Sequence, residues 1–142
     1  IEADIYGNAN STHINGSRLM NALGGSGDFT RNAYISSFIS PSVAKDGAIS
    51  AIVPMVSHVD HTEHDAMVFI TEYGVADLRG LAPRDRVQKM ISIAHPSYRP
   101  LLEEYVELAA KSKYQATPHD LRHAFDFHNR IEATGTMMKE AE

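Results

Sequence analysis

Three glycines within four residues form the stretch of this sequence best suited to bind an anion. In "NALGGSGDFTRNA" (residues 21–33), Gly24, Gly25 and Gly27 are followed by acidic, aromatic and basic residues. Because glycine has no Cβ, the backbone can take a positive φ and a ligand can reach the amides. If a helix begins at "DFTRNAY", its free N–H groups add a positive end there. The stretch therefore indicates either an anion-binding loop or a plain turn between two elements.

A polar segment precedes the glycines. The residues of "NANSTHINGS" (8–17) are of types that hydrogen-bond their own backbone, which predicts a tightly turned loop. Such a loop could bring Asn10, Thr12 and His13 to a pocket, or it could be a polar connection without a ligand.

Histidines spaced by three and separated by acidic residues occur in "SHVDHTEHD" (57–65). His58, His61 and His64 are residue types that bind zinc or iron. However, the run lies between two predicted strands and lacks the i, i+4 histidine pair that directs two imidazoles to one metal. We therefore expect these groups to hydrogen-bond one another and the turn, and we assign no metal site. The remaining histidines (His95, His119, His123 and His128) are interpreted as structural.

Two single residues are also candidates for chemistry. Glu72 ends an apolar run and precedes Gly74, and ligands of open α/β sheets collect outside the carboxyl ends of strands. The alternative for Glu72 is an ion pair with Arg79 or a capping role. Lys45, in "SVAKDG", is predicted in a turn, where it could hold a phosphate or be solvated.

These candidates must be positioned by strands in the first part of the chain. Apolar runs rich in β-branched and aromatic residues predict strands within residues 33–39, 48–56 and 66–74, and the chain opens on the strand-like "IEADIYG". The last two runs are almost continuously apolar, as in strands buried on both faces. Pro54 cannot donate a ladder hydrogen bond, so its strand should bulge or lie at an edge.

The later part of the chain has the period of amphipathic helices. We predict helices after Pro83, Pro100 and Pro118, and Thr117 with Asp120 resembles a capping box for the third. Their apolar positions are Val87, Met90, Ile91 and Ala94, then Leu101, Leu102, Tyr105, Val106 and Ala109, then Leu121, Ala124, Phe125 and His128. The result is an α/β domain over residues 1–130, followed by a mobile tail at 131–142.

Composition narrows the function classes. The 142 residues are 43% apolar and 22% charged with a net charge of -5, which argues against a broad nucleic-acid surface. The absence of cysteine excludes a disulfide framework, a thiolate zinc site and a cysteine nucleophile, and fits a reducing, cytoplasmic compartment. No run approaches the roughly 20 apolar residues that cross a bilayer, so we expect no membrane partner.

Three segments carry a resemblance to a known family. In chain order, "GNANSTHINGSRLMNALGGSGDFTRNA", "VPMVSHVDHTEHD" and "TEYGVADLRGLAPRDR" closely resemble the C-terminal part of the acetyl-CoA hydrolase and CoA-transferase family, in particular its succinyl-CoA:acetate CoA-transferases. The resemblance covers about residues 5–105. It implies a NagB/RpiA/CoA-transferase-like open sheet with helices packed on it. The substrates it implies are an acyl-CoA and a small carboxylate, with coenzyme A as a substrate part and no tightly bound cofactor.

The resemblance also implies roles for individual residues. The Gly25 amide would be one donor of an oxyanion hole, Gly24 would shape the loop, and Lys45 would contact coenzyme A. Glu72 matches a second glutamate that assists a nucleophilic glutamate. That nucleophile belongs to an earlier part of the family's chain, so we expect a missing N-terminal domain and an inactive fragment. The chain begins at Ile1, which we interpret as a piece of a longer protein.

Other functions stay open at this point. Within the family, the alternative is an acyl-CoA hydrolase with water as acceptor. Outside it, the glycine loop could belong to a non-catalytic CoA- or nucleotide-binding module, and the histidine run could belong to a metal-dependent hydrolase. For the full-length protein we expect a homo-oligomer, a dimer.

Overall fold

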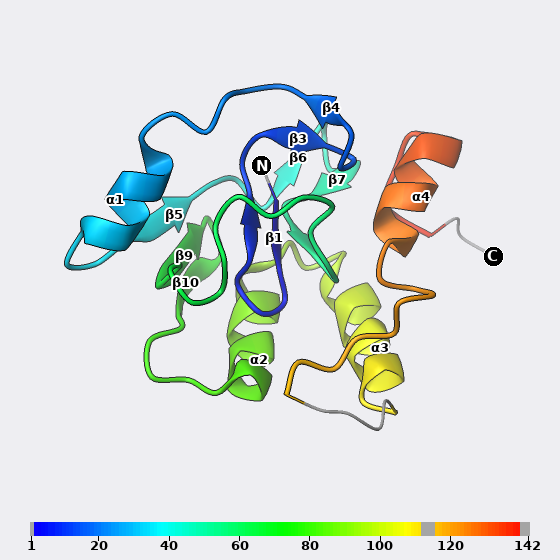
Figure 1. Ribbon diagram of the computed structural model, residues 1–142. Helices are drawn as coiled ribbons and strands as arrows, with labels where there is room; N and C mark the ends of the chain where they lie inside the picture. The colour runs from blue at the N-terminus through cyan, green and yellow to red at the C-terminus, as the bar shows by residue number, and fades with distance from the viewer. Residues whose placement is uncertain (1, 112–115, 140–142) are drawn as a thin grey trace.

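The computed structural model describes residues 2–111 and 116–139, which contain ten strands and four helices (Figure 1). The strands are β1 (Glu2–Asp4), β2 (Ala9–Asn10), β3 (His13–Ile14), β4 (Arg18–Leu19), β5 (Ser37–Ile39), β6 (Val43–Ala44), β7 (Ile49–Ser50), β8 (Ile52–Val53), β9 (Val68–Thr71) and β10 (Gly74–Asp77). The helices are α1 (Ser26–Asn32), α2 (Pro83–Ile93), α3 (Arg99–Ala109) and α4 (Asp126–Thr134). The predicted α/β class is confirmed.

The strands form several small sheets. β1 lies between β2, which is antiparallel to it, and β8, which is parallel. β9 lies between β10, which is antiparallel, and β5, which is parallel. β3–β4 and β6–β7 are separate hairpins. β8 is an edge strand and ends directly before Pro54, which confirms the expectation for a residue that cannot donate to a ladder.

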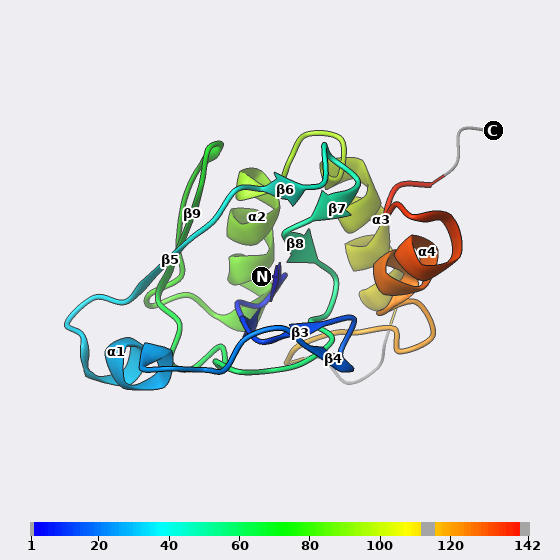
Figure 2. The ribbon, with the colours of Figure 1, turned by 90° about the horizontal axis from the view of Figure 1, so that it is seen from above.

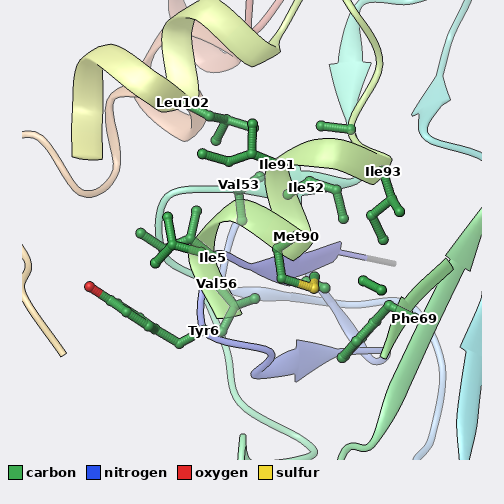
Figure 3. Close-up of a cluster of buried hydrophobic side chains, with 14 of the residues drawn as sticks. Ile5, Tyr6, Ile52, Val53, Val56, Phe69, Met90, Ile91, Ile93 and Leu102 are labelled. Atoms are coloured by element: carbon green, nitrogen blue, oxygen red, sulfur yellow. The ribbon is translucent and has the colours of Figure 1, made fainter. Parts of the chain in front are cut away.

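Helix α2 joins the two three-stranded sheets. It packs against β8, β9, β10 and α3. Figure 3 shows Met90, Ile91 and Ile93 of α2 beside Ile52 and Val53 of β8. All five side chains are buried, so one apolar core holds both sheets together.

The sequence explains the boundaries of α2 and α3. Pro83 is the first residue of α2, where its missing N–H costs no helical hydrogen bond, and α2 ends before the His95-Pro96 pair that disfavours further helix. Pro100 lies in the first turn of α3. Both helices bury the predicted apolar face, so these two predictions are confirmed.

The predicted start of the third helix is wrong. Helix α4 begins at Asp126 rather than just after Pro118, and Leu121 is 73% exposed. The Asp120 carboxylate accepts hydrogen bonds from the backbone N–H and the guanidinium of Arg122. Asp120 therefore stabilises a turn, and the expected capping box does not start a helix.

The predicted boundary at residue 131 falls inside α4. This helix ends at Gly135, whose left-handed φ of 82° suits a glycine C-cap. Beyond it, the Met137 side chain is buried and its N–H donates to the Ala48 carbonyl oxygen. The mobility of the tail stays a prediction, and residues 140–142 lie outside the described residues.

No helix in the described part of the chain combines the length and apolar character needed to cross a membrane.

Candidate functional site

Gly24 and Gly25, which we call the glycine loop, lead into helix α1, and their backbone is exposed to solvent. Gly24 has a φ of 59°, which glycine takes without strain, and Gly25 is the N-cap of α1 with a φ of -86°. Gly25 is exposed, and its N–H has no hydrogen-bond acceptor among residues 2–111 and 116–139. An unsatisfied donor at a helix start is a suitable partner for a developing negative charge.

A hydrogen bond between Ser26 and His61 links the glycine loop to the histidine run. Ser26, the first residue of α1, lies with its Oγ 3.0 Å from His61 Nε2 and 2.8 Å from the Leu23 carbonyl oxygen. Because Ser26 has a single hydroxyl proton, donation to Leu23 leaves His61 Nε2 as the donor to Ser26 Oγ. His61 is buried, and burial lowers its pKa. This imidazole therefore supports the glycine loop.

The polar loop before the glycines satisfies its own groups. Asn10 is fully buried, and its Oδ1 accepts hydrogen bonds from the N–H groups of Thr12 and His13. Thr12 Oγ1 donates to the Asp60 carboxylate at 2.8 Å. Burial favours a raised pKa for Asp60, but hydrogen bonds from Ser11 and Thr12 outweigh it and the pKa is lowered. These contacts fit the structural interpretation of the loop.

The three histidines of the run have different surroundings. His58 packs against the His13 ring at a tilt of 35° and lies 3.4 Å from an Asp60 oxygen, His61 contacts Ser26, and His64 is exposed. Within the described ranges, no group of three or more His, Asp or Glu side chains has an arrangement that could hold a metal ion. Within the run, His58 lies beside Asp60 and His64 lies 3.8 Å from Glu63, whereas His61 bonds to Ser26 outside the run.

Glu72 lies at the tip of the β9–β10 hairpin with both carboxylate oxygens held. Ser42 donates its N–H to Oε2 at 2.8 Å and its Oγ–H to Oε1 at 2.5 Å. The serine hydroxyl is the largest cause of a lowered pKa for Glu72, and His95 adds a smaller electrostatic contribution. The considered pairing with Arg79 is not formed, because Arg79 binds Asp77 at 2.7 Å. Glu72 is an exposed carboxylate that is kept ionised.

Lys45 occupies a strained turn at the tip of the β6–β7 hairpin. Lys45 and Asp46 have positive φ values of 48° and 53°, and the Gly47 N–H donates to the Ala44 carbonyl oxygen at 3.2 Å. This is the backbone pattern of a type I′ turn. The turn, His95, Ser97 and Met138 line an open groove of about 580 Å³.

The structure groups two of the four predicted site residues. His95 lies near both Lys45 and Glu72. It lines the same groove as Lys45, and it contributes electrostatically to the lowered pKa of Glu72. Figure 2 shows α1, which follows Gly24 and Gly25, at one edge of the molecule and the β6–β7 hairpin beyond the other end of β5. The glycine loop and the groove are therefore two separate parts of this chain's surface.

Two residues with a role in this geometry were missed by sequence reasoning. Ser42 holds Glu72, although 30 positions separate the two residues in the sequence. His95 was interpreted as structural, yet it lines the groove and packs edge-on against Tyr73 with ring centroids 5.5 Å apart. Only the parallel pairing of β5 with β9 brings Ser42 near the hairpin tip, so no local motif indicated the contact.

Comparison with known proteins shows the family to which this chain belongs. Residues 1–106 match the model of the acetyl-CoA hydrolase/transferase C-terminal domain. The chain belongs to this family.

Several relatives have been named for their activities. The chain is 57% identical over 138 residues to a succinyl-CoA:acetate CoA-transferase of Clostridium kluyveri, covering 96% of this chain and 26% of the relative. It is 55% identical to a propanoyl-CoA:succinate CoA transferase of Escherichia coli, with 97% and 28% covered. It is 47% identical to an acetyl-CoA hydrolase of Saccharomyces cerevisiae, with 96% and 28% covered. The chain thus spans about a quarter of the length of these relatives.

Solved structures show the same fold. RipA from Yersinia pestis superposes with a TM-score of 0.69 at 33% identity, covering 75% of this chain and 26% of RipA. A 4-hydroxybutyrate CoA-transferase from Porphyromonas gingivalis gives a TM-score of 0.59 at 36% identity, with 75% and 24% covered.

Proposed function

We propose that the protein containing this chain transfers coenzyme A from an acyl-CoA, such as succinyl-CoA, to a carboxylic acid such as acetate. The observation that carries the proposal is the exposed Glu72 carboxylate, which buried Ser42 holds in its ionised form. A fixed carboxylate suits chemistry on carboxylic acids and their thioesters. Relatives named as CoA-transferases, at 55% and 57% identity, support the same substrate class.

The reaction is proposed to pass through the protein as a glutamyl-CoA thioester. A glutamate outside this chain attacks the thioester carbonyl, so that the carbon–sulfur bond breaks and an acyl anhydride and CoA thiolate form. The thiolate then attacks the glutamyl carbonyl and releases the first carboxylate. The acceptor carboxylate attacks the resulting glutamyl thioester, which expels CoA thiolate and forms a second anhydride. The thiolate then attacks the acyl carbonyl of this anhydride, so that the new acyl-CoA forms and the glutamate is regenerated. Each addition places negative charge on a carbonyl oxygen.

Residues of this chain stabilise and orient these steps in the proposal. The Gly25 N–H donates to the developing oxyanion, and Gly24 gives the loop the positive φ that exposes this donor. Glu72 supplies a fixed negative charge and a hydrogen-bond acceptor beside the nucleophilic glutamate. Lys45 binds an anionic part of coenzyme A from its groove. The remaining length of the protein supplies the attacking glutamate.

The second candidate function is hydrolysis of acetyl-CoA. It is favoured by relatives named acetyl-CoA hydrolases, such as those of Saccharomyces cerevisiae and Candida albicans at 47% and 49% identity. In this reaction water replaces the acceptor acid and attacks the same glutamyl thioester.

The test is an assay of the full-length protein with succinyl-CoA, in the presence and absence of acetate. Transfer predicts that acetate accelerates loss of succinyl-CoA and that acetyl-CoA accumulates. An unchanged rate with free coenzyme A as the product would contradict transfer and support the hydrolase.

A further inference from the structure

We propose that Ser42 is a positioning residue that fixes the carboxylate of Glu72 for the reaction. The inference rests on the proposed function, because it requires that Glu72 acts in turnover. It adds a residue that no sequence motif of this chain identifies.

The contact between Ser42 and Glu72 restrains the whole carboxylate. The backbone N–H of Ser42 reaches Oε2 at 2.8 Å, and its hydroxyl reaches Oε1 at 2.5 Å. Two donors on two oxygens fix both the position and the plane of the group. Glu72 is otherwise exposed, so without Ser42 its side chain would sample several rotamers.

Ser42 can act in this way because it is immobilised by the fold. Its side chain is fully buried, and its carbonyl oxygen accepts the Ala51 N–H at 2.8 Å. The preceding strand is fixed to the hairpin, since the Ser40 N–H donates to the Ile70 carbonyl oxygen at 3.1 Å. Ser42 is therefore held in place by the sheets, and its hydrogen bonds restrain the exposed Glu72 side chain.

The hairpin tip is also held from its other side. Thr71 Oγ1 donates to the Ile93 carbonyl oxygen at 2.6 Å, and the Arg99 guanidinium lies over the Tyr73 ring at 5.4 Å. His95 packs against the same ring. The backbone of the tip is thus anchored without Ser42, so removing the serine hydroxyl frees Glu72 Oε1, keeps the Ser42 N–H on Oε2 and leaves the turn in place.

Loss of the hydroxyl has a defined effect on ionisation. Ser42 is the main reason that the pKa of Glu72 is lowered, so a Ser42→Ala variant has a Glu72 pKa closer to the ordinary value. The other titratable or charged groups near this tip are Tyr73, His95 after α2 and Arg99 on α3, and the variant leaves them unchanged. The acid limb of the pH–rate profile should therefore move to higher pH.

The experiment compares wild type, Ser42→Ala, Glu72→Ala and the double variant in the full-length protein. Succinyl-CoA and acetate are the substrates, and kcat and KM are measured from pH 3 to 8, with the acetate concentration counted as the anion. Ser40→Ala is the matched control, because this serine lies two residues away and its side chain is exposed. Ser42→Thr keeps the hydroxyl, and thermal unfolding of every variant reports folding.

If Ser42 positions Glu72, Ser42→Ala should lower kcat about tenfold, the loss expected for a charge-assisted hydrogen bond, with little change in KM. Ser42→Thr restores the rate, and Ser42→Ala has no further effect in the Glu72→Ala background. Equal losses in both backgrounds, or an unmoved acid limb, would show that Ser42 is only structural and would leave the proposed function intact. A Glu72→Ala variant with wild-type turnover would instead overturn the role of Glu72, and the inference with it.

Discussion

The glycine loop and the Glu72 turn differ in how completely this chain prepares them. At the loop, Gly25 carries an N–H without an acceptor in the described chain, and neighbouring Phe29 is 77% exposed. At the turn, both Glu72 oxygens already accept hydrogen bonds from a buried serine. The carboxylate is thus oriented within the chain, whereas the amide still lacks its partner. In the proposed function, the substrate and the rest of the protein provide that partner.

The surroundings of the two regions show the same difference. Eight exposed large apolar side chains lie between residues 14 and 39: Ile14, Leu19, Met20, Leu23, Phe29, Tyr34, Ile35 and Ile39. Exposed apolar side chains in this number are typical of surfaces that contact another part of a protein. At the Glu72 tip Tyr73 is also exposed, at 42%, but its ring is packed by His95 and Arg99.

The largest effect is expected at the prepared carboxylate. Glu72→Ala should lower kcat of the full-length protein about a thousandfold, the upper range found for loss of one fixed electrostatic contact in an active site. Steady-state turnover of succinyl-CoA with acetate measures this. Glu103→Ala, which removes an exposed carboxylate on α3, is the control and should keep the rate. Equal rates for the two variants would remove Glu72 from the mechanism.

The open amide should give the next largest effect. Gly25→Pro removes the N–H at a φ of -86°, which is close to proline's value, and should lower kcat about a hundredfold. Gly25→Ala keeps the donor. Its Cβ would lie 3.3 Å from the exposed Phe29 ring, which can move, so this control should lose much less activity. If both variants lose the same activity, loop shape matters and the donor does not.

A smaller effect is expected at the groove. Lys45→Ala should raise KM for the CoA thioester about fivefold, or about 1 kcal/mol, and leave kcat nearly unchanged, because an exposed charge contributes modestly to binding. The increase should shrink at high salt, which screens the contact. Lys89→Ala, an exposed lysine of α2, serves as control. A fall in kcat at constant KM would place Lys45 in the chemical step instead.

The smallest effect concerns the frame of the Glu72 turn. Thr71→Val removes the buried hydrogen bond to Ile93 and should lower the free energy of unfolding by about 1 kcal/mol. Urea unfolding of the full-length protein, followed by a probe in this domain, measures the change. No loss of stability would mean that packing alone fixes the hairpin.

The sequence predicted the parts of the fold that depend on local pattern. Helices α2 and α3 follow from apolar spacing and from prolines at their starts, and β9 follows from its continuous apolar run. The predicted start of the third helix was wrong because the Asp120 carboxylate accepts a hydrogen bond from Arg122 and does not form a capping box with Thr117. The sequence alone does not decide between these two arrangements.

The sequence predicted the site residues that can be recognised from their own type and local position. It missed the residue whose role depends on a contact with a distant part of the chain. The position of Glu72 after a strand and of Lys45 in a turn followed from the sequence. The contact of Ser42 with Glu72 depends on pairing between β5 and β9, which are distant in the chain, and so no spacing of residues indicated it.

The most direct test of the account is a crystal structure of the full-length protein with a bound acyl-CoA. The Gly25 nitrogen should lie about 2.7–3.1 Å from the thioester carbonyl oxygen, with the Ser42–Glu72 contact retained. A Gly25 N–H bonded to a protein oxygen, or directed away from the thioester, would contradict this prediction.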